Sequence, residues 1–429
     1  MNATHMVHNS RSSGVLCHTG GLPVQLNSER LTLAAFWLSF ASAATILLSI
    51  AASQILLGLA LALLLVSGAK LRLPRIWLPL ALFLLGTVIS LVFSAEPARG
   101  IPQLRKIFVF SILLVVFSTF RNIQNARRLV LVWGVIGAVV ASRGLVQFAM
   151  KVQEAAAKGV DFYTFYTPDR ITGFMSHWMT FAGQEMVVLL LMLAFLFFAP
   201  KTKRVGMWIW VLLTAVIAVA ELLNETRTVW LALAVSGLWL LWSWKRWTAV
   251  LVPAVALLAI SVAPGSVHDR FMSFFQPKKN VDSNEFRTVT FRTGIEIIKA
   301  HPLLGLGPEG TKYHFQDYVP KDIPRPLPSG WYGHLHNIYL QYAAERGIPT
   351  MLMMVWLLLM ILYDFFRSLR KLPPGRSNER FLLQGGIAVV LGIMVSGLFE
   401  FNLGDSEVLT VFLVTVALGY LAVEKPALN

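Results

Sequence analysis

The chain has 429 residues, of which 56% are hydrophobic and 14% are charged, and its mean hydropathy is +0.64. Soluble domains carry about 25% charged residues, so this composition excludes an ordinary soluble globular protein. The net charge of +15 does not indicate nucleic-acid binding, because the basic residues stand in short clusters between apolar segments, as membrane topology produces. The single cysteine, Cys17, excludes a disulfide framework within the chain and a cysteine-based metal site.

The apolar residues form twelve blocks that predict an all-α polytopic membrane protein. Most blocks approach the about 20 residues that a helix needs to cross the hydrocarbon core of a bilayer. They are continuous rather than alternating, which favours helices over the strands of a membrane β-barrel. The block at 107–120 is short, so we expect its helix to start upstream, near Ile101. The predicted spans are 31–50, 52–68, 76–94, 107–120, 129–150, 178–199, 205–223, 228–243, 247–264, 347–365, 382–399 and 407–423.

The charges of the connecting loops predict the orientation of the chain. Loops after even-numbered spans are rich in Lys and Arg, with Glu379 as their acidic exception, whereas loops after odd-numbered spans are mixed or acidic. By the positive-inside rule, the first set of loops and both termini lie in the cytoplasm. The basic residues of that set are Lys70, Arg72, Arg75, Arg121, Arg127, Arg128, Lys201, Lys203, Arg204, Lys245, Arg246, Arg367, Arg370, Lys371, Arg376 and Arg380.

Five parts follow from this topology. They are a cytoplasmic tail (1–30), spans one to nine (31–264), a long outer loop with short helices (265–346), spans ten to twelve (347–423) and a second cytoplasmic tail (424–429). The first 30 residues have no apolar core, so we expect no cleavable signal peptide and a first span that directs its own insertion. Long loops on a rigid scaffold tend to bind and to catalyse, so the loop 265–346 is the predicted catalytic region.

Two segments of this outer loop predict helices. Residues 287–301 form an amphipathic pattern that stops at Pro302, because the Gly- and Pro-rich run after it cannot continue a helix. Residues 334–350 predict a polar helix, and Gly347 and Pro349 then break or bend the chain before the tenth span. Such a helix can hold His336 at the membrane surface, where a lipid-linked substrate is met.

These segments resemble the O-antigen ligase family in four places. The run His336-Asn337, nine residues, Gly347, two residues, Thr350 is similar to that family's His-Asn/Ser/Gln motif, which is followed at the same spacing by Gly and by Gly, Thr or Tyr. Residues 287–307 resemble its segment in which an Arg and an aromatic residue lead into a Pro-Leu-x-Gly-x-Gly turn. Residues 225–231 resemble its Ser-Arg segment, with Thr226 in place of Ser, and residues 170–174 resemble its Arg-x-x-Gly segment.

The resemblance implies a glycosyltransferase of lipopolysaccharide biosynthesis in the bacterial inner membrane. Such an enzyme moves a polysaccharide from undecaprenyl pyrophosphate to the lipid A–core acceptor on the periplasmic face, among membrane lipids and without a metal or other cofactor. The leaving pyrophosphate gathers negative charge, which arginine forks stabilise well. The attacking sugar hydroxyl must lose a proton, to which a neutral histidine is well matched.

His336 is therefore the predicted base, and Arg227 and Arg287 are the predicted pyrophosphate ligands. Arg143 lies in the fifth span, where a charge at full depth costs roughly 2.5–3.5 kcal/mol, and it is either functional or paired with Glu185. Second-rank pyrophosphate ligands are Arg170 and Arg292, and possible supporting residues are Arg143, Asn337, His334 and Glu345.

Other functions remain open from the residues. The same motifs fit an O-antigen polymerase, whose acceptor is another lipid-linked glycan, or a protein O-oligosaccharyltransferase. A lipid-linked glycan flippase or transporter would explain many spans, but it would normally place its polar residues near the bilayer midplane. The segment Asp405-Ser406-Glu407 is interpreted as a solvated turn rather than as a metal site.

Overall fold

The computed structural model describes residues 22–201, 203–261, 265–278, 281–282 and 284–424. Most of the two predicted tails, and Cys17, lie outside these residues. Within the described part of the chain every regular element is a helix, which agrees with the predicted all-α fold. The elements are α1 (Leu22–Thr45), α2 (Ile50–Val66), α3 (Trp77–Val92), α4 (Pro97–Thr119), α5 (Ile123–Lys158), α6 (Phe162–Tyr166), α7 (Trp178–Phe198), α8 (Arg204–Asn224), α9 (Arg227–Trp244), α10 (Thr248–Ser261), α11 (Ser266–Met272), α12 (Asn284–Ala300), α13 (Gly310–His314), η1 (Phe315–Tyr318), α14 (Ile338–Lys371), α15 (Asn378–Ser396), η2 (Asn402–Gly404) and α16 (Ser406–Glu424).

A helix stands at each of the twelve predicted spans. Seven of them, α4, α5, α7, α8, α14, α15 and α16, are long and apolar enough to cross a membrane, and α2, α3 and α10 are apolar but shorter. α4 starts at Pro97, so the predicted upstream start of the fourth block is confirmed. The described helices therefore support a multi-pass membrane protein, while the count of twelve spans stays a prediction.

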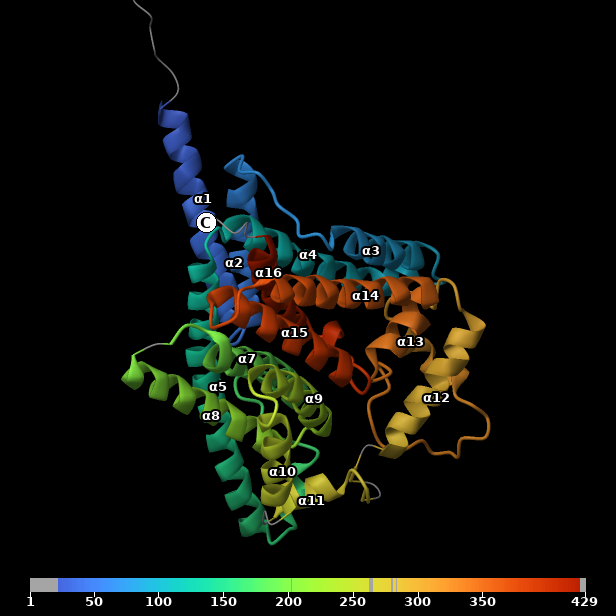
Figure 1. The fold of residues 1–429 in the computed structure, drawn as a ribbon. Coiled ribbons are helices and arrows are strands. Elements are labelled where there is room, and N and C mark those ends of the chain that lie inside the picture. The colour runs from blue at the N-terminus through green and yellow to red at the C-terminus, as the bar shows by residue number, and fades with distance from the viewer. Residues whose placement is uncertain (1–21, 202, 262–264, 279–280, 283, 425–429) are drawn as a thin grey trace, which may run out of the picture.

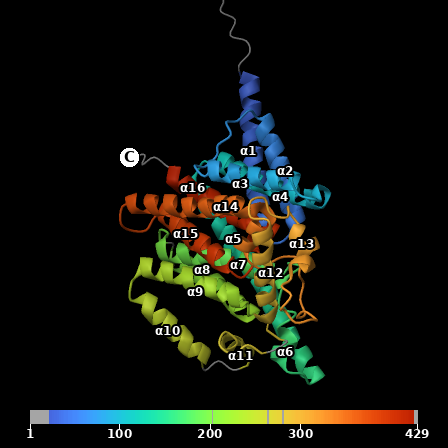
Figure 2. The same ribbon diagram turned by 90° about the vertical axis from the view of Figure 1, so that its right-hand side faces the viewer.

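The long helices pack into one bundle around α15 (Figures 1 and 2). α15 packs against α7 and α9 on one side and against α14 and α16 on the other. α1 pairs with α2, α14 with α3, α16 with α4 and α5 with α8. α7 and α16 are buried along most of their length, whereas α8 and α10 expose apolar side chains along theirs. Exposed apolar faces on such helices are the surfaces that lipid covers.

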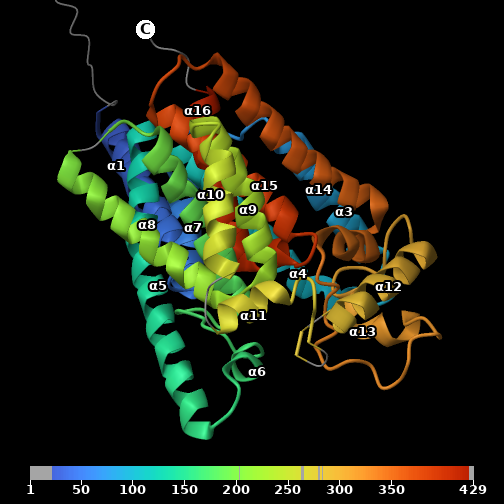
Figure 3. The same cartoon turned by 60° about the horizontal axis from the view of Figure 1, so that its bottom comes forward.

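The short helices gather at one end of the bundle (Figure 3). α6, α11, α12 and α13 all lie there, and α12 is the amphipathic helix that the sequence predicts. Its buried residues Val289 and Ile297 share a small core of their own with Phe315 and Leu335. This end therefore carries a folded cap that is separate from the large core of the bundle.

A sharp bend in α14 joins this cap to the membrane. Gly347 has φ +80° and ψ 160°, so the helix is interrupted between a short outer part and the long apolar part, as the sequence predicts. A Cβ atom at Gly347 would lie 1.9 Å from the Leu303 carbonyl oxygen, so no other residue fits there. The turn after α12 lies against this bend, with Leu306 N donating to Ala344 O at 2.9 Å and Gly307 N donating to Glu345 O at 2.8 Å. Two of the segments that resemble the ligase family thus meet through their backbones.

The loop charges give a testable orientation for this bundle. Reporter fusions near Lys158, at the end of α5, and near Lys312, in α13, are expected to report the periplasm, and both residues lie at the end that carries the cap (Figure 3). A cytoplasmic signal at Lys312 would contradict the orientation, because the cap would then face the wrong compartment. Fusions expected to report the cytoplasm are those after Arg75, Arg128, Arg204, Arg246 and Arg380.

Candidate active site

A cavity of about 820 Å³ lies between the cap and the bundle. Its lining comes from α4, α7, α9, α11, α12 and α14 and from the loops beside them, which are far apart in the sequence. Cavities of this size, with a few convergent polar groups, are the usual places for ligands. Six predicted site residues line it, namely His336, His334, Arg227, Arg287, Arg170 and Glu345.

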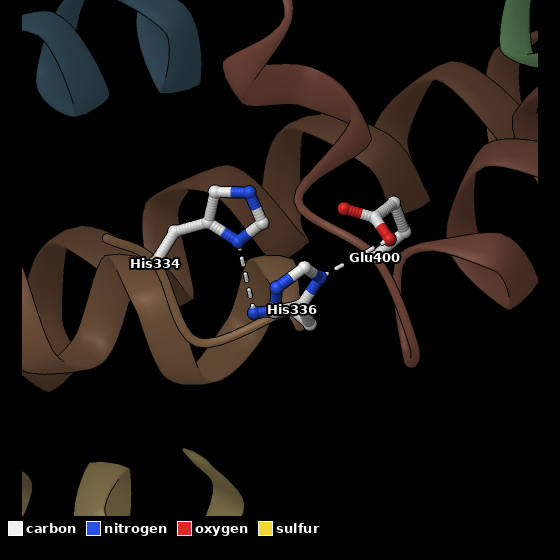
Figure 4. Close-up of side chains that lie close together, drawn as sticks. All are labelled: His334, His336 and Glu400. Carbon is white, nitrogen blue, oxygen red and sulfur yellow. Dashed lines mark hydrogen bonds and ion pairs between the residues drawn. The ribbon is translucent and has the colours of Figure 1, made fainter. Parts of the chain in front are cut away.

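His336 is paired with a carboxylate that the sequence analysis did not single out. Its Nδ1 lies 3.3 Å from Oε2 of Glu400, in the loop between α15 and α16 (Figure 4). Both side chains are largely buried, at 12% and 13% exposure. His334 lies beside them, its Nδ1 accepting a hydrogen bond from the His336 backbone N–H at 3.3 Å. The Glu400 carboxylate thus contacts the His336 imidazole, which lines the cavity.

The charges of this cluster decide which atom can act as a base. Burial acts to raise the pKa of Glu400, but the charge and hydrogen bond of His336, with the charges of His334 and Arg287, bring that pKa down to about 2. An ionised carboxylate only accepts hydrogen bonds, so the proton of a neutral His336 ring sits on Nδ1. Nε2 is then left as an acceptor, and it has no hydrogen-bond partner within the described part of the chain. A donor from a substrate would satisfy this buried nitrogen.

The neighbouring histidine is less suited to that role. Burial, and then the charge of His336, lower the pKa of His334 to about 4, so its ring stays neutral and weakly basic at neutral pH. Its Nδ1 is also occupied by the backbone of His336.

The backbone around His336 is unusual. His336 has φ +49°, in the left-handed region that few non-glycine residues adopt. The next residue, Asn337, caps α14, because its side-chain oxygen accepts from the N–H groups of Tyr339 and Leu340 at 2.9 Å each. Its amide nitrogen donates to Leu398 O at 2.8 Å, two residues before Glu400. Asn337 therefore holds His336 and Glu400 in register without lining the cavity itself.

Arg287 is the arginine with free donors. It projects from α12 into the cavity lining, and its guanidinium makes no hydrogen bond or ion pair with any residue that the structure describes. It lies close enough to Glu400 for its charge to help lower the pKa of that carboxyl. Burial lowers the pKa of Arg287 itself, with Arg270 acting in the same direction, yet a guanidinium stays charged at neutral pH. The N–H donors of its guanidinium are therefore available to bind an anion.

Arg227 and Arg170 are held more firmly by the protein. Arg227, the first residue of α9, donates from NH1 to Ser273 O at 2.7 Å and from NH2 to Asn284 Oδ1 at 2.5 Å. Arg170 donates to the backbone oxygens of Thr167 and Glu225 at 3.0 and 3.2 Å. Burial lowers the pKa of Arg170 to about 9, which still leaves it charged at neutral pH. Both residues add positive charge to the cavity wall while bracing the loops around it.

A fourth arginine, Arg270 of α11, was missed by the sequence analysis. Its NH1 is 2.6 Å from Oδ1 of Asp282, in an ion pair that is almost wholly buried, and Tyr163 of α6 donates to the same carboxylate at 2.9 Å. This network ties α6, α11 and the segment before α12 together. Arg270 lines the cavity close to Arg227 and Arg287. We refer to Arg170, Arg227, Arg270 and Arg287 as the arginine wall.

Two predicted residues lie elsewhere. Arg292 pairs with Asp322 at 2.7 Å on the exposed surface of the cap and does not line the cavity. Arg143 is exposed and lies over the Phe174 ring at 4.4 Å. Of the two interpretations of Arg143, the pairing with Glu185 is wrong, because neither carboxylate oxygen of Glu185 has a hydrogen-bond partner among the described residues. Gly137 marks the face of α5 that lies against Glu185. Arg143 comes six residues after Gly137, and at about 100° per residue its side chain points to a different face of the helix.

The residues missed in the sequence share one property. Glu400 stands in a short loop, Arg270 at the end of a short helix and Lys106, which also lines the cavity, within α4, and at each of these places a single charge has many explanations. Only the fold brings Glu400 to His336, 64 residues away in the chain. The one available signal was that Glu400 and Asp405 lie in an outer loop that the positive-inside rule leaves acidic.

The same cluster has the composition of a metal site. Ligand atoms of His334, His336 and Glu400 lie within 4.8 Å of one another. His and carboxylate ligands suit several divalent ions, but the free cation of Arg287 stands beside the carboxylate and opposes a second positive charge. Independence from metal thus stays a prediction that chelation tests.

A comparison with protein families adds one finding. Residues 212–355 match the O-antigen ligase family model. The matched segment covers about a third of the chain, from within α8 into α14, and contains Arg227, Arg287 and His336. It supports membership of the O-antigen ligase and polymerase superfamily and an enzyme of glycosyltransferase type. A comparison with curated proteins found no match.

Proposed function

We propose that the protein is an O-antigen ligase, which transfers polysaccharide from undecaprenyl pyrophosphate to lipid A–core at the periplasmic face of the inner membrane. The observation that carries this proposal is the His336–Glu400 pair in the same cavity as the guanidinium of Arg287, which has no partner among the described residues. A base and an anion-binding fork at one site are what this transfer needs.

The reaction is a displacement at the anomeric carbon of the donor glycan. An acceptor hydroxyl attacks this carbon, a new glycosidic bond forms, and the bond between the carbon and the pyrophosphate oxygen breaks. The hydroxyl proton passes to Nε2 of His336, and the ionised Glu400 stabilises the imidazolium that results. The bonding electrons leave with undecaprenyl pyrophosphate, whose added negative charge is stabilised by Arg287 and the rest of the arginine wall.

The alternatives differ in the acceptor, so one incubation separates them. Purified protein is mixed with an undecaprenyl-pyrophosphate glycan, lipid A–core and an acceptor protein, and the products are separated on a gel. Joined lipopolysaccharide is the expected product. Lengthened lipid-linked glycan without joining would instead indicate a polymerase. Glycan on a protein acceptor would indicate an oligosaccharyltransferase, and the absence of any transfer would indicate a flippase or transporter.

Glu400 is expected to act through His336. Glu400→Gln should slow transfer by up to the about 10²–10⁴-fold that a general base contributes, because the amide no longer fixes the tautomer or stabilises the imidazolium. Glu400→Asp should restore part of the rate. The measurement is the transfer rate of the two single variants and of the double variant with His336→Ala. If the effects of His336→Ala and Glu400→Gln multiply in the double variant, the two residues act independently and the pairing is wrong.

Transfer is expected to survive exhaustive treatment with EDTA, since arginines carry the positive charge of the site. The transfer rate is measured before and after chelation, and again after adding Mg²⁺ or Mn²⁺. Loss of turnover that either ion restores would point to the His334, His336 and Glu400 cluster, or to Asp405 and Glu407, as a metal site and would overturn the metal-free mechanism.

A further inference from the structure

A second polar group lines the cavity and takes no part in the mechanism above. It consists of Gln103 and Lys106 in the first half of α4, Glu309 before α13, Glu345 near the bend of α14, and Asp405 before α16, and we call it the α4 cluster. All five residues line the same cavity as His336. None of them belongs to the arginine wall.

The members of the α4 cluster are joined to one another and to the fold. The Gln103 amide nitrogen donates to the Glu309 carboxylate. Lys106 Nζ donates to Gly404 O at 2.6 Å, and the carboxylates of Glu309, Glu345 and Asp405 lie around its ammonium group. Arg346, which does not line the cavity, also acts on Lys106, and burial raises the pKa of Glu345 to about 7. Among the residues that line this side of the cavity, three carboxyl groups therefore stand beside one lysine.

The charges of the cavity are segregated. Arg270 and Arg287 act on Arg227, Arg270 acts on Arg287, and Arg287 acts on Glu400, whereas the charges that act most on Lys106 are those of Arg346, Glu309, Glu345 and Asp405. The histidines lie between the two groups, since Arg287 acts on Glu400 and Lys106 acts on His334. The cavity thus has a positive side and a carboxylate side, with the predicted base at their boundary.

The carboxylate side is built to receive hydroxyl groups rather than phosphates. Carboxylate and amide oxygens accept hydrogen bonds from hydroxyls, whereas a phosphate beside several carboxylates meets like-charge repulsion. Gln103 is only 8% exposed, and its Oε1 has no partner within the described part of the chain. A buried acceptor at a cavity wall, with no donor from the protein, is explained by a donor on a ligand.

We propose that the α4 cluster is the acceptor subsite and that the sugar it holds is unphosphorylated, bound through its hydroxyls. This inference rests on the proposed function, which puts the pyrophosphate of the donor on the arginine wall. A sugar on the opposite side presents a hydroxyl toward His336 from the direction away from the leaving group. Donor and acceptor then meet at the base, each on the side that matches its charge.

Steady-state kinetics of Gln103→Ala test the subsite. We expect the KM for lipid A–core to rise about tenfold, the effect of one lost hydrogen bond, while the KM for the undecaprenyl-pyrophosphate glycan stays within about twofold. Gln316→Ala, an exposed glutamine in η1 outside the cavity, is the matched control and should change neither constant. A rise in the donor KM with an unchanged acceptor KM would overturn the subsite.

A charge-dependent readout separates recognition from a merely structural effect. Wild type is expected to use lipid A–core with a phosphate on its terminal sugar at least about tenfold less efficiently than the same acceptor after phosphatase treatment. Glu309→Gln should lower the ratio of the efficiency with the unphosphorylated acceptor to that with the phosphorylated one, because it removes one of the charges that repel the phosphate. Equal use of both acceptors by the wild type, or an unchanged ratio in the variant, would overturn the inference. Wild type that joins no glycan to either acceptor overturns the proposed function and this inference with it.

Discussion

His336→Ala is expected to lower the rate of glycan transfer by about 10²–10⁴-fold, the contribution of a general base. The reason lies in the arrangement of the ring: Nδ1 faces the ionised Glu400 at 3.3 Å, and Nε2 is left without a partner from the described residues. Removing the ring removes the proton acceptor but leaves the arginine wall in place. The measurement is the single-turnover rate of transfer from undecaprenyl pyrophosphate at saturating acceptor.

A second histidine of the cap serves as the control. His301 follows α12, bonds the Tyr318 hydroxyl at 2.7 Å and does not line the cavity. His301→Ala should therefore retain most of the transfer rate. Equal membrane insertion of each variant must be shown by fractionation. If His334→Ala abolishes transfer while His336→Ala leaves it nearly intact, the base has been assigned to the wrong histidine.

Arg287→Ala is expected to weaken donor binding by about tenfold to hundredfold, because a charge-assisted contact is worth on the order of 1.5–3 kcal/mol. It should slow transfer as well, since the leaving pyrophosphate gains charge in the transition state. Arg287→Lys keeps the charge but loses the fork, so it should restore only part of the affinity. Binding of radiolabelled undecaprenyl pyrophosphate and the transfer rate are the two measurements.

Arg292 offers a matched control on the same helix. Its guanidinium pairs with Asp322 on the surface of the cap, 2.7 Å away, so Arg292→Ala should leave donor affinity nearly unchanged. Arg227→Ala is a less clean probe, because it also removes hydrogen bonds to Ser273 and Asn284 that brace α9 against the cap. Donor affinity that falls with Arg292→Ala as much as with Arg287→Ala would contradict the placement of the pyrophosphate in the cavity.

Local patterns predicted the parts of this molecule that depend on local physics. The apolar blocks predicted where the long helices lie, and the amphipathic run before Pro302 predicted α12. The break at Gly347 followed from a glycine and a proline in succession, and the structure adds why only glycine fits, because the turn after α12 packs against that backbone. These features need only neighbours in the chain.

Features that depend on tertiary contacts could not be predicted in this way. Glu400 looked like one acidic residue of an outer loop until the fold placed it beside His336. Arg292 was a second-rank candidate beside Arg287, but the two are five residues apart on α12, and only Arg287 lines the cavity. The pairing of Arg143 with Glu185 failed for the same reason, since the rotation of a helix about its axis decides which side chains meet.

Donor binding by His336→Ala and Arg287→Ala, measured side by side, tests most directly the claim that the cavity separates a base from a pyrophosphate site. Labelled undecaprenyl pyrophosphate is titrated against each purified variant and the wild type. We expect His336→Ala to bind it with nearly wild-type affinity, and Arg287→Ala to bind it about tenfold to hundredfold more weakly. If His336→Ala loses donor affinity as severely as Arg287→Ala does, His336 is itself a pyrophosphate ligand and its assignment as the base is wrong.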